Sequence, residues 1–143
     1  MKKMLFFATL VACSMLFFSC NNKTADVNLY PIAGKTYQAT EAQGTILLSF
    51  RTNFKASFTI KPNAGSTTTN DSFVWQMSLD TIPGTEQSRK IFINFADGTV
   101  YTPTGKDVSG LRAYEGLYDG QKCVIYPTYP TEDKEGALTY LPL

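Results

Sequence analysis

Residues 45–61 read Thr-Ile-Leu-Leu-Ser-Phe-Arg-Thr-Asn-Phe-Lys-Ala-Ser-Phe-Thr-Ile-Lys, and this stretch decides the fold. Large apolar residues occupy every second position in its first half, and the same alternation returns in its second half: Ile46, Leu48 and Phe50, then Ala56, Phe58 and Ile60. A period of two is the pattern of a β-strand with one buried face. Because only Thr52-Asn53-Phe54 separates the two runs, we expect them to pair as an antiparallel hairpin.

The same alternation recurs along the chain, between turn-forming sequences. It predicts further strands at residues 35–40, 72–79, 90–95, 99–102, 111–118, 122–126 and 137–141. Asp97-Gly98 and Asp119-Gly120 are hairpin signals, and Pro83-Gly84 is a turn signal. We expect the polar stretches 62–71, 103–110 and 127–136 to be loops.

These runs make eight or nine strands with short sequential links, and no stretch keeps a 3.6-residue apolar period. The sequence therefore predicts an all-β domain. The economical topology is a single antiparallel meander of about eight strands that closes into a barrel, since closure removes exposed strand edges. A barrel of this size has an interior that side chains fill or that holds one small ligand. A two-sheet sandwich is the alternative.

The N-terminal region has the layout of an export signal. Lys2 and Lys3 precede an apolar run over residues 4–18, which is shorter than the roughly 20 residues needed to span a bilayer. The following Phe17-Phe18-Ser19-Cys20 resembles a bacterial lipobox, the motif in which a cysteine is lipidated and cleaved at its amino side. This resemblance implies lipid attachment at Cys20 and a membrane partner reached through it.

A second cysteine, in Leu10-Val11-Ala12-Cys13, also fits the motif. Cleavage before Cys13 would leave an apolar run that is too short for a signal peptide. It would also leave the apolar residues 15–18 exposed on the mature chain, so we favour Cys20. The predicted organisation is a signal peptide over 1–19, a lipidated tether over 20–28 and a barrel domain over 29–143. The uncharged residues after Cys20 favour, by resemblance to other lipoproteins, the periplasmic side of the outer membrane over surface exposure.

The composition narrows the possible functions. Of 143 residues, loss of the first 19 leaves 124, which suits one domain. The mature chain has 11 Lys and Arg against 12 Asp and Glu, a balance that gives no electrostatic case for binding nucleic acid. Histidine is absent and Cys123 is the single cysteine after Cys20, so we expect no zinc site, no cofactor and no enzyme built on a histidine base.

Three segments resemble a known family. Pro31-Ile32-Ala33-Gly34-Lys35-Thr36-Tyr37, then Ile46-Leu47-Leu48-Ser49-Phe50, then Phe58-Thr59-Ile60 are similar to small lipocalin-like lipoproteins of Bacteroidetes. That resemblance covers the first third of the mature chain and implies a lipocalin-like barrel. Tyr37 stands where tryptophan is more usual in that family.

Some side chains are candidates for a site. Trp75, Tyr114 and Tyr118 could line a ligand pocket because each combines an apolar body with a polar group. We favour core packing for Trp75, and a barrel rim that faces water for the tyrosines, over this ligand pocket. Glu115 is an acidic candidate if it faces inward; we expect Tyr114, Gly116 and Tyr118 to face inward instead. Asp80-Thr81-Ile82 resembles the O-glycosylation site of Bacteroidetes, with Thr81 as acceptor. Glu132-Asp133-Lys134-Glu135 is expected to be a solvated loop, and no metal site is predicted.

Two functions fit these features. The first is a lipid-anchored envelope protein that binds a small apolar or amphipathic ligand inside the barrel. The second is an envelope interaction or inhibitor module that acts on a protein partner through loops 62–71 and 127–136, without a small-molecule ligand.

Overall fold

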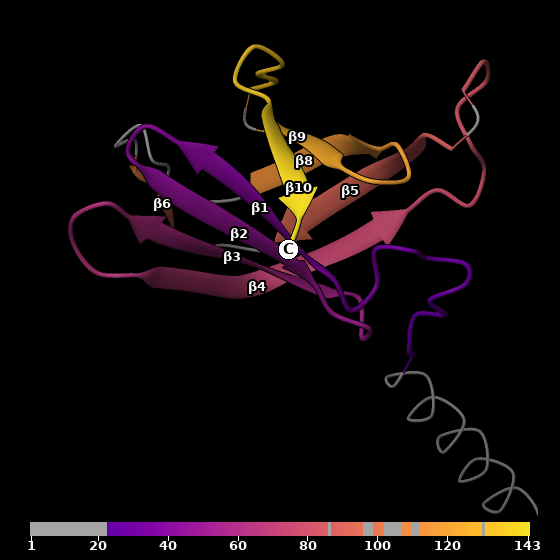
Figure 1. Cartoon of the computed structure of the whole chain (residues 1–143), viewed down its shortest axis with the longest axis horizontal. Coiled ribbons are helices and arrows are strands. Elements are labelled where there is room, and N and C mark those ends of the chain that lie inside the picture. Colours follow the sequence, from indigo (N-terminus) through magenta and orange to yellow (C-terminus); the bar gives the residue numbers. More distant parts are fainter. Residues whose placement is uncertain (1–22, 86, 96–98, 102–106, 110–111, 130) are drawn as a thin grey trace, which may run out of the picture.

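The protein forms a closed, eight-stranded antiparallel barrel with a separate two-stranded sheet beside it (Figure 1). The structure is a computed structural model, and it describes residues 23–85, 87–95, 99–101, 107–109, 112–129 and 131–143. The strands are β1 Thr36–Glu41, β2 Gly44–Phe50, β3 Lys55–Pro62, β4 Thr68–Met77, β5 Arg89–Phe95, β6 Thr99–Tyr101, β7 Asp107–Ser109, β8 Arg112–Tyr118, β9 Cys123–Tyr129 and β10 Leu138–Pro142. The barrel order is β1-β10-β9-β8-β5-β4-β3-β2, so the closed meander is confirmed and the sandwich alternative is wrong.

The hairpin expected from residues 45–61 is confirmed as β2–β3. Ile46 pairs with Ile60 and Leu48 with Phe58, which puts the apolar residues of both strands on the inner face. Phe54, the last residue of the turn, has a φ of 62°. Such a conformation is usual for glycine, and its cost is offset here because the Phe54 ring packs on Trp75 at 5.0 Å between centroids.

The expected loop over 62–71 is wrong in its second half. Strand β4 begins at Thr68, and Thr68, Thr69 and Asn70 pair with the far end of β3. A β-bulge between the Ala56 and Phe58 pairings adds one residue to β4. The polar residues of β4 face solvent and follow no apolar alternation, so their strand conformation left no hydrophobic signal.

The expected end of the strand at Tyr126 is also wrong. Strand β9 continues to Tyr129, and Pro127 pairs with Tyr114 while Tyr129 pairs with Ala113. This pairing contains a register shift, which inserts one residue at Thr128. Proline lacks the amide hydrogen that a regular ladder needs, and a bulge is one of the places where a sheet accepts it.

The Asp97-Gly98 signal predicts that residues 90–95 pair with residues 99–102, and this prediction is wrong. Asp97 and Gly98 themselves lie outside the described residues. Strand β5 pairs along its whole length with β8, from Arg89 opposite Tyr118 to Phe95 opposite Arg112. Residues 99–101 pair instead with residues 107–109, within the stretch 103–110 that the sequence predicts to be a loop. The small β6–β7 sheet is therefore an insertion between two barrel strands that are neighbours in space.

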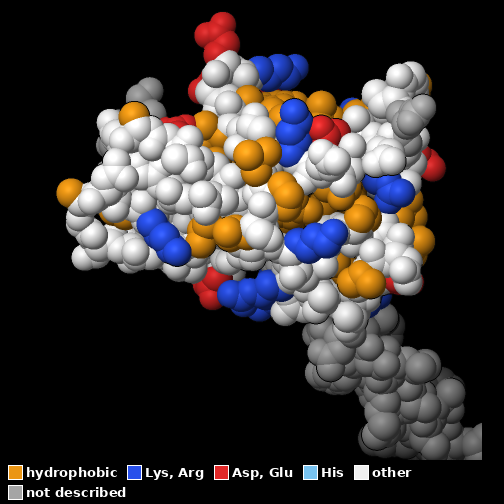
Figure 2. Space-filling view, viewed as in Figure 1, with side chains coloured by type: hydrophobic (Ala, Val, Ile, Leu, Met, Phe, Trp, Pro, Cys, Tyr) orange, Lys and Arg blue, Asp and Glu red, His pale blue; other side chains and the backbone are white. Residues whose placement is uncertain are grey.

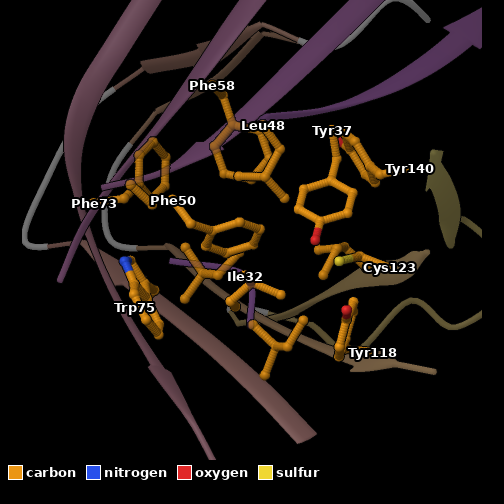
Figure 3. Close-up of a cluster of buried hydrophobic side chains, with 14 of the residues drawn as sticks. Ile32, Tyr37, Leu48, Phe50, Phe58, Phe73, Trp75, Tyr118, Cys123 and Tyr140 are labelled. Carbon is orange, nitrogen blue, oxygen red and sulfur yellow. The ribbon is translucent and has the colours of Figure 1, made fainter. Parts of the chain in front are cut away.

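Aromatic side chains fill the barrel (Figure 3). The largest fully buried residues come from strands all round the barrel and from the segment before β1: Trp75, Tyr37, Phe50, Phe73, Ile32, Leu48, Ile91, Ile93 and Cys123. Rings meet edge to face, as in the pairs Tyr37–Phe50 at 5.9 Å and Phe58–Phe73 at 4.9 Å. Such contacts add about 0.5–1.5 kcal/mol each beyond the burial of their area.

The strand directions define two ends of the barrel. Successive strands run in opposite directions, so their connections alternate between the ends. The proximal end carries the N-terminal segment 23–35, the connections 51–54, 78–88 and 119–122, and residue 143. The distal end carries the connections 42–43, 63–67 and 130–137, together with the long connection that contains β6 and β7.

Packing against the barrel begins before residue 29. Ala25, in the segment expected to be a tether, is buried, and its amide donates to the carbonyl of Thr52 at the proximal end. A turn follows, in which the amides of Leu29 and Tyr30 donate to the carbonyl of Asp26. The Tyr30 ring then lies 5.7 Å from the Trp75 ring. The N-terminal segment thus covers part of the proximal end.

Candidate functional site

Trp75 lies in the core near the proximal end. Its exposed fraction is 1%, and its indole nitrogen donates to the carbonyl of Arg51 at 3.0 Å. Three aromatic rings surround it, those of Tyr30, Phe50 and Phe54. Because both its polar and its apolar parts have protein partners, Trp75 closes the barrel rather than presenting a free surface to a ligand.

Tyr118 lies on the other side of the barrel, in a small polar group within the core. Its hydroxyl donates to the carbonyl of Gly120 at 2.8 Å, and the hydroxyl of Tyr37 is hydrogen-bonded to that of Tyr118. The Cys123 thiol is buried in the same region (Figure 3). Burial raises the pKa of Tyr118 and raises the pKa of Cys123 to about 12. These groups stay neutral and protonated at ordinary pH, which suits a packing role.

Tyr114 faces the interior toward the distal end, apart from Trp75 and Tyr118. Its ring lies 5.3 Å from that of Phe58 and 6.2 Å from that of Phe73. Trp75, Tyr114 and Tyr118 therefore lie at three separate places in the barrel. The structure does not bring them together around one cavity.

Two open depressions do lie on the surface near the proximal end. One, of about 450 Å³, lies between the start of β1, the 119–122 turn and the end of β10, and includes Tyr118, Lys35 and Lys122. The other, of about 410 Å³, is bordered by Tyr30, Phe54 and residues 74–77 of β4. Each volume is within the range of small-molecule sites, although both are open to solvent, unlike the concave and mostly enclosed sites that bury a ligand.

Glu115 lies on the outer face of β8, with Tyr114, Gly116 and Tyr118 on the inner side as expected. The Tyr126 hydroxyl is 3.5 Å from its carboxylate, which makes a weak hydrogen bond. Gly116 is required at its position because a side chain there would meet Ile125 and the carbonyl of Val124 on β9. Among the described residues, no group of three His, Cys, Asp or Glu side chains is placed to hold a metal ion.

The loop 131–137 is held by its own hydrogen bonds. The Asp133 amide donates to the carbonyl of Pro127 at 2.9 Å, and the Asp133 carboxylate accepts from the Gly136 amide at 2.8 Å. Lys134 forms an ion pair with Glu132 at 2.7 Å. The expected acidic loop is thus exposed and has a defined shape.

The remaining candidates lie elsewhere. Thr81 is exposed in the connection between β4 and β5, where a modifying enzyme could reach it. Cys20 lies outside the described residues. Within the described part of the chain, no helix is long and apolar enough to cross a membrane.

Loops 62–71 and 127–136 both lie at the distal end of the barrel, on opposite sides of it, because β3 and β9 are four places apart in the ring of eight strands. In an antiparallel meander every second connection lies at the same end, and these two loops follow the third and seventh strands of the barrel. Asn63 ties the same end together by donating to the carbonyls of Gln43 and Ala42. An even number of barrel strands separates the two loops, and this count is the sequence signal that they share an end. The count is correct only when residues 99–102 are left out of the barrel.

Comparison with known proteins found no matching protein-family model, no matching curated protein and no matching solved structure.

Proposed function

We propose that this protein is a lipid-anchored envelope protein that uses the distal end of its barrel to bind another envelope protein. The lipid is attached at Cys20, and the outer membrane, on its periplasmic side, is the site of action. The barrel is the rigid support, and the distal connections 63–67 and 131–137, with the β6–β7 sheet, form the contact surface.

The filled interior is the observation that carries this proposal. Trp75, Tyr37 and Phe50 are each almost completely buried, and the Phe50 ring packs against the other two inside the barrel. Protein interiors packed in this way leave no room for a guest without displacing side chains. A function outside the barrel therefore fits the domain better than a ligand inside it.

The distal end supports the proposal in a second way. Strands β5 and β8 are paired at Phe95 and Arg112, so two residues could have joined them. The chain uses residues 96–111 there instead and forms a second sheet. Most connections in compact domains have only about 4–6 residues, so a connection of this length calls for a reason beyond joining two strands. The ordered loop 131–137 adds a surface that needs little rearrangement on binding.

Site-specific photo-crosslinking in the producing cell tests this proposal. A photoreactive residue at Ser66 or Thr131, both exposed at the distal end, should give a discrete protein adduct. The same residue at Thr85 or Gln121, exposed at the proximal end, is the matched control and should not. Equal protein adducts from both ends, or none from the distal positions, would contradict the proposal.

A small amphipathic ligand is the second candidate, and the depression beside Tyr118 favours it. Its lining combines tyrosine, the methylene stems of Lys35 and Lys122, and Leu141. Native mass spectrometry of the purified mature protein should then detect a co-purifying molecule. That molecule should be lost on Tyr118→Ala and retained on Tyr114→Ala, because Tyr114 lies away from the depression.

A further inference from the structure

Exposed apolar side chains gather at the proximal end. Of the large hydrophobic residues that are exposed in the described chain, most belong to this end: Val27 at 56%, Leu29 at 51%, Leu79 at 55%, Leu141 at 56% and Leu143 at 75%. Val74 and Leu117 lie on the outer wall beside the same end, where they pair with Lys55 and Lys90, and Tyr129 lies near the distal end. Single exposed residues are ordinary, but a group at one end of a small domain marks an interaction surface.

Hydrogen bonds hold two of these segments to the start of β5. The Arg89 guanidinium donates to the carbonyl of Leu29 at 2.7 Å, which holds the N-terminal turn against the start of β5. The Ser78 amide donates to the carbonyl of Lys90 at 2.9 Å, which holds the segment leading to Leu79 beside the same strand. Leu29 and Leu79 therefore both belong to segments that lie beside the start of β5, which carries Arg89 and Lys90.

The proximal end is also basic. Among described residues it carries seven cationic and three acidic side chains: Lys23, Lys35, Arg51, Lys55, Arg89, Lys90 and Lys122 against Asp26, Asp80 and Asp119. The side chains described at the distal end have the opposite balance, with Lys61 and Lys134 against Glu41, Glu132, Asp133 and Glu135. Figure 2 shows basic and apolar side chains close to the point where the N-terminal chain joins the domain.

The short stretch between Cys20 and Ala25 limits how far the proximal end can lie from a lipid attached at Cys20. Ala25 is bound to the proximal end through the Thr52 carbonyl. Only five residue steps separate Ala25 from Cys20, and a fully extended chain covers about 3.5 Å per residue, or roughly 17 Å in all. A lipid on Cys20 would therefore hold the proximal end against the bilayer surface.

We propose that the proximal end is a membrane-docking surface that lies on anionic phospholipid headgroups. Lysine and arginine side chains meet the lipid phosphates, while Val27, Leu29, Leu79 and Leu143 enter the boundary between headgroups and acyl chains. Docking fixes the orientation of the barrel and directs the distal end away from the membrane. The lipid of the proposed function brings the surface close, but the docking contacts are those of the described domain.

Fluorescence quenching on vesicles tests this docking. The mature chain, labelled through Leu29→Cys or, as a control, Ser66→Cys, is reconstituted into phosphatidylcholine vesicles with or without phosphatidylglycerol. Cys123 is buried and does not compete for the label. A nitroxide-bearing lipid should quench the label at position 29 at least several-fold more than the label at position 66. Phosphatidylglycerol should increase that difference, and high salt should reduce it.

Charge variants give the matched control. Lys35→Glu and Lys122→Glu should each weaken docking by about five-fold or more, since each basic residue near an anionic surface contributes on the order of 1 kcal/mol. Lys61→Glu makes the same change in charge at the distal end and should leave docking unchanged. In a chain without the lipid, docking alone holds the protein on vesicles. The fraction of protein bound to vesicles should then fall in Lys35→Glu and Lys122→Glu and stay unchanged in Lys61→Glu.

Equal quenching at positions 29 and 66, or indifference to phosphatidylglycerol and to both proximal variants, would overturn the docking proposal. Protection of position 29 only when envelope proteins are added would assign the surface to a protein instead. Neither outcome bears on the photo-crosslinks from the distal end, so the two proposals fail separately.

Discussion

At the scale of single residues, Trp75 shows how much one side chain contributes to closing the barrel. Replacing Trp75 by Ala removes a buried ring from contact with Phe50 and Phe54. The free energy of unfolding should fall by about 3–5 kcal/mol. Trp75→Phe keeps most of the apolar volume but removes the indole donor from the carbonyl of Arg51, which then accepts only from the Phe54 amide at 3.2 Å. This change should cost about 1–3 kcal/mol.

Urea unfolding followed by circular dichroism measures both variants. Val74→Ala is the control on the same strand, because Val74 is 50% exposed and its loss should change the free energy of unfolding by less than about 0.5 kcal/mol. A Trp75→Ala protein as stable as the Val74→Ala protein would show that Trp75 is not part of the core.

Cys123 makes the free energy of unfolding depend on pH in the alkaline range. Burial raises the pKa of its thiol from 9.0 to about 12, so the folded state holds the proton that the unfolded state releases. The unfolded state binds fewer protons in this window, and stability therefore falls as pH rises from about 9 toward about 12. The slope should approach 1.4 kcal/mol per pH unit above pH 9.

Unfolding measured at pH 8, 9 and 10 tests this effect. The buried tyrosines, whose pKa is also raised, lower the stability of both proteins over the same range, so the comparison with Cys123→Ala isolates the thiol. Cys123→Ala should be less stable at pH 8 because it loses buried volume, but its stability should decline less between pH 9 and pH 10. Parallel declines in the two proteins would exclude Cys123 as the titrating group.

At the scale of elements, the β6–β7 sheet is separable from the barrel. It pairs with no other strand that the structure describes, and its flanking strands β5 and β8 are paired up to Phe95 and Arg112. Replacing residues 96–111 by Asn-Gly should therefore give a two-residue hairpin. We expect a folded barrel with a free energy of unfolding within about 2 kcal/mol of the original, and loss of the distal photo-crosslink.

Thermal unfolding and circular dichroism follow the barrel, and the Thr131 photo-crosslink follows the partner. A shortened chain that fails to fold would show that the β6–β7 sheet supports the barrel. A shortened chain that folds and keeps the crosslink would restrict the contact surface to the loops 63–67 and 131–137.

The strand elements also show how far sequence reasoning reaches. Alternation identified β2 and β3 because Ile46, Leu48 and Phe58 must all point to one core. It could not identify the first half of β4, whose side chains are mostly polar and exposed. It also predicted that β9 ends before Pro127, because a proline normally interrupts a strand, whereas a bulge allows β9 to continue to Tyr129. Local hairpin signals likewise cannot show that β5 pairs with β8, since that choice is made by the closing of the barrel.

The candidate site was harder to predict than the fold for a related reason. Strand alternation correctly placed Tyr114, Gly116 and Tyr118 on the inner face, but a face is shared by the whole barrel. Whether Trp75 and Tyr118 meet depends on strand order and on the N-terminal turn that brings Tyr30 onto Trp75. Those are tertiary facts with no local signature in the sequence.

At the scale of the whole molecule, charge and chain length combine to orient the domain. Basic residues such as Lys35 and Lys122 lie at the end where the N-terminal chain is bound, and acidic residues such as Glu132 lie at the other. The whole chain has a formal net charge of only +1, so its net charge conceals this separation. The separation aligns the molecule on an anionic surface in the same sense as an anchor before Ala25 would.

The position of the anchor is itself testable. Cys20→Ala should abolish the incorporation of labelled fatty acid and release the protein from the membrane, because several acyl chains on one residue provide essentially permanent attachment. Cys13→Ala should change neither property, since Cys13 lies inside the predicted signal and would be removed with it. The opposite pattern would assign the lipid to Cys13. It would also extend the chain before Ala25 to twelve residue steps, or roughly 40 Å, which is long enough to free the proximal end from the membrane. Under the proposed lipidation, the identity of the modified cysteine therefore decides whether the domain is held in one orientation or moves on a long tether.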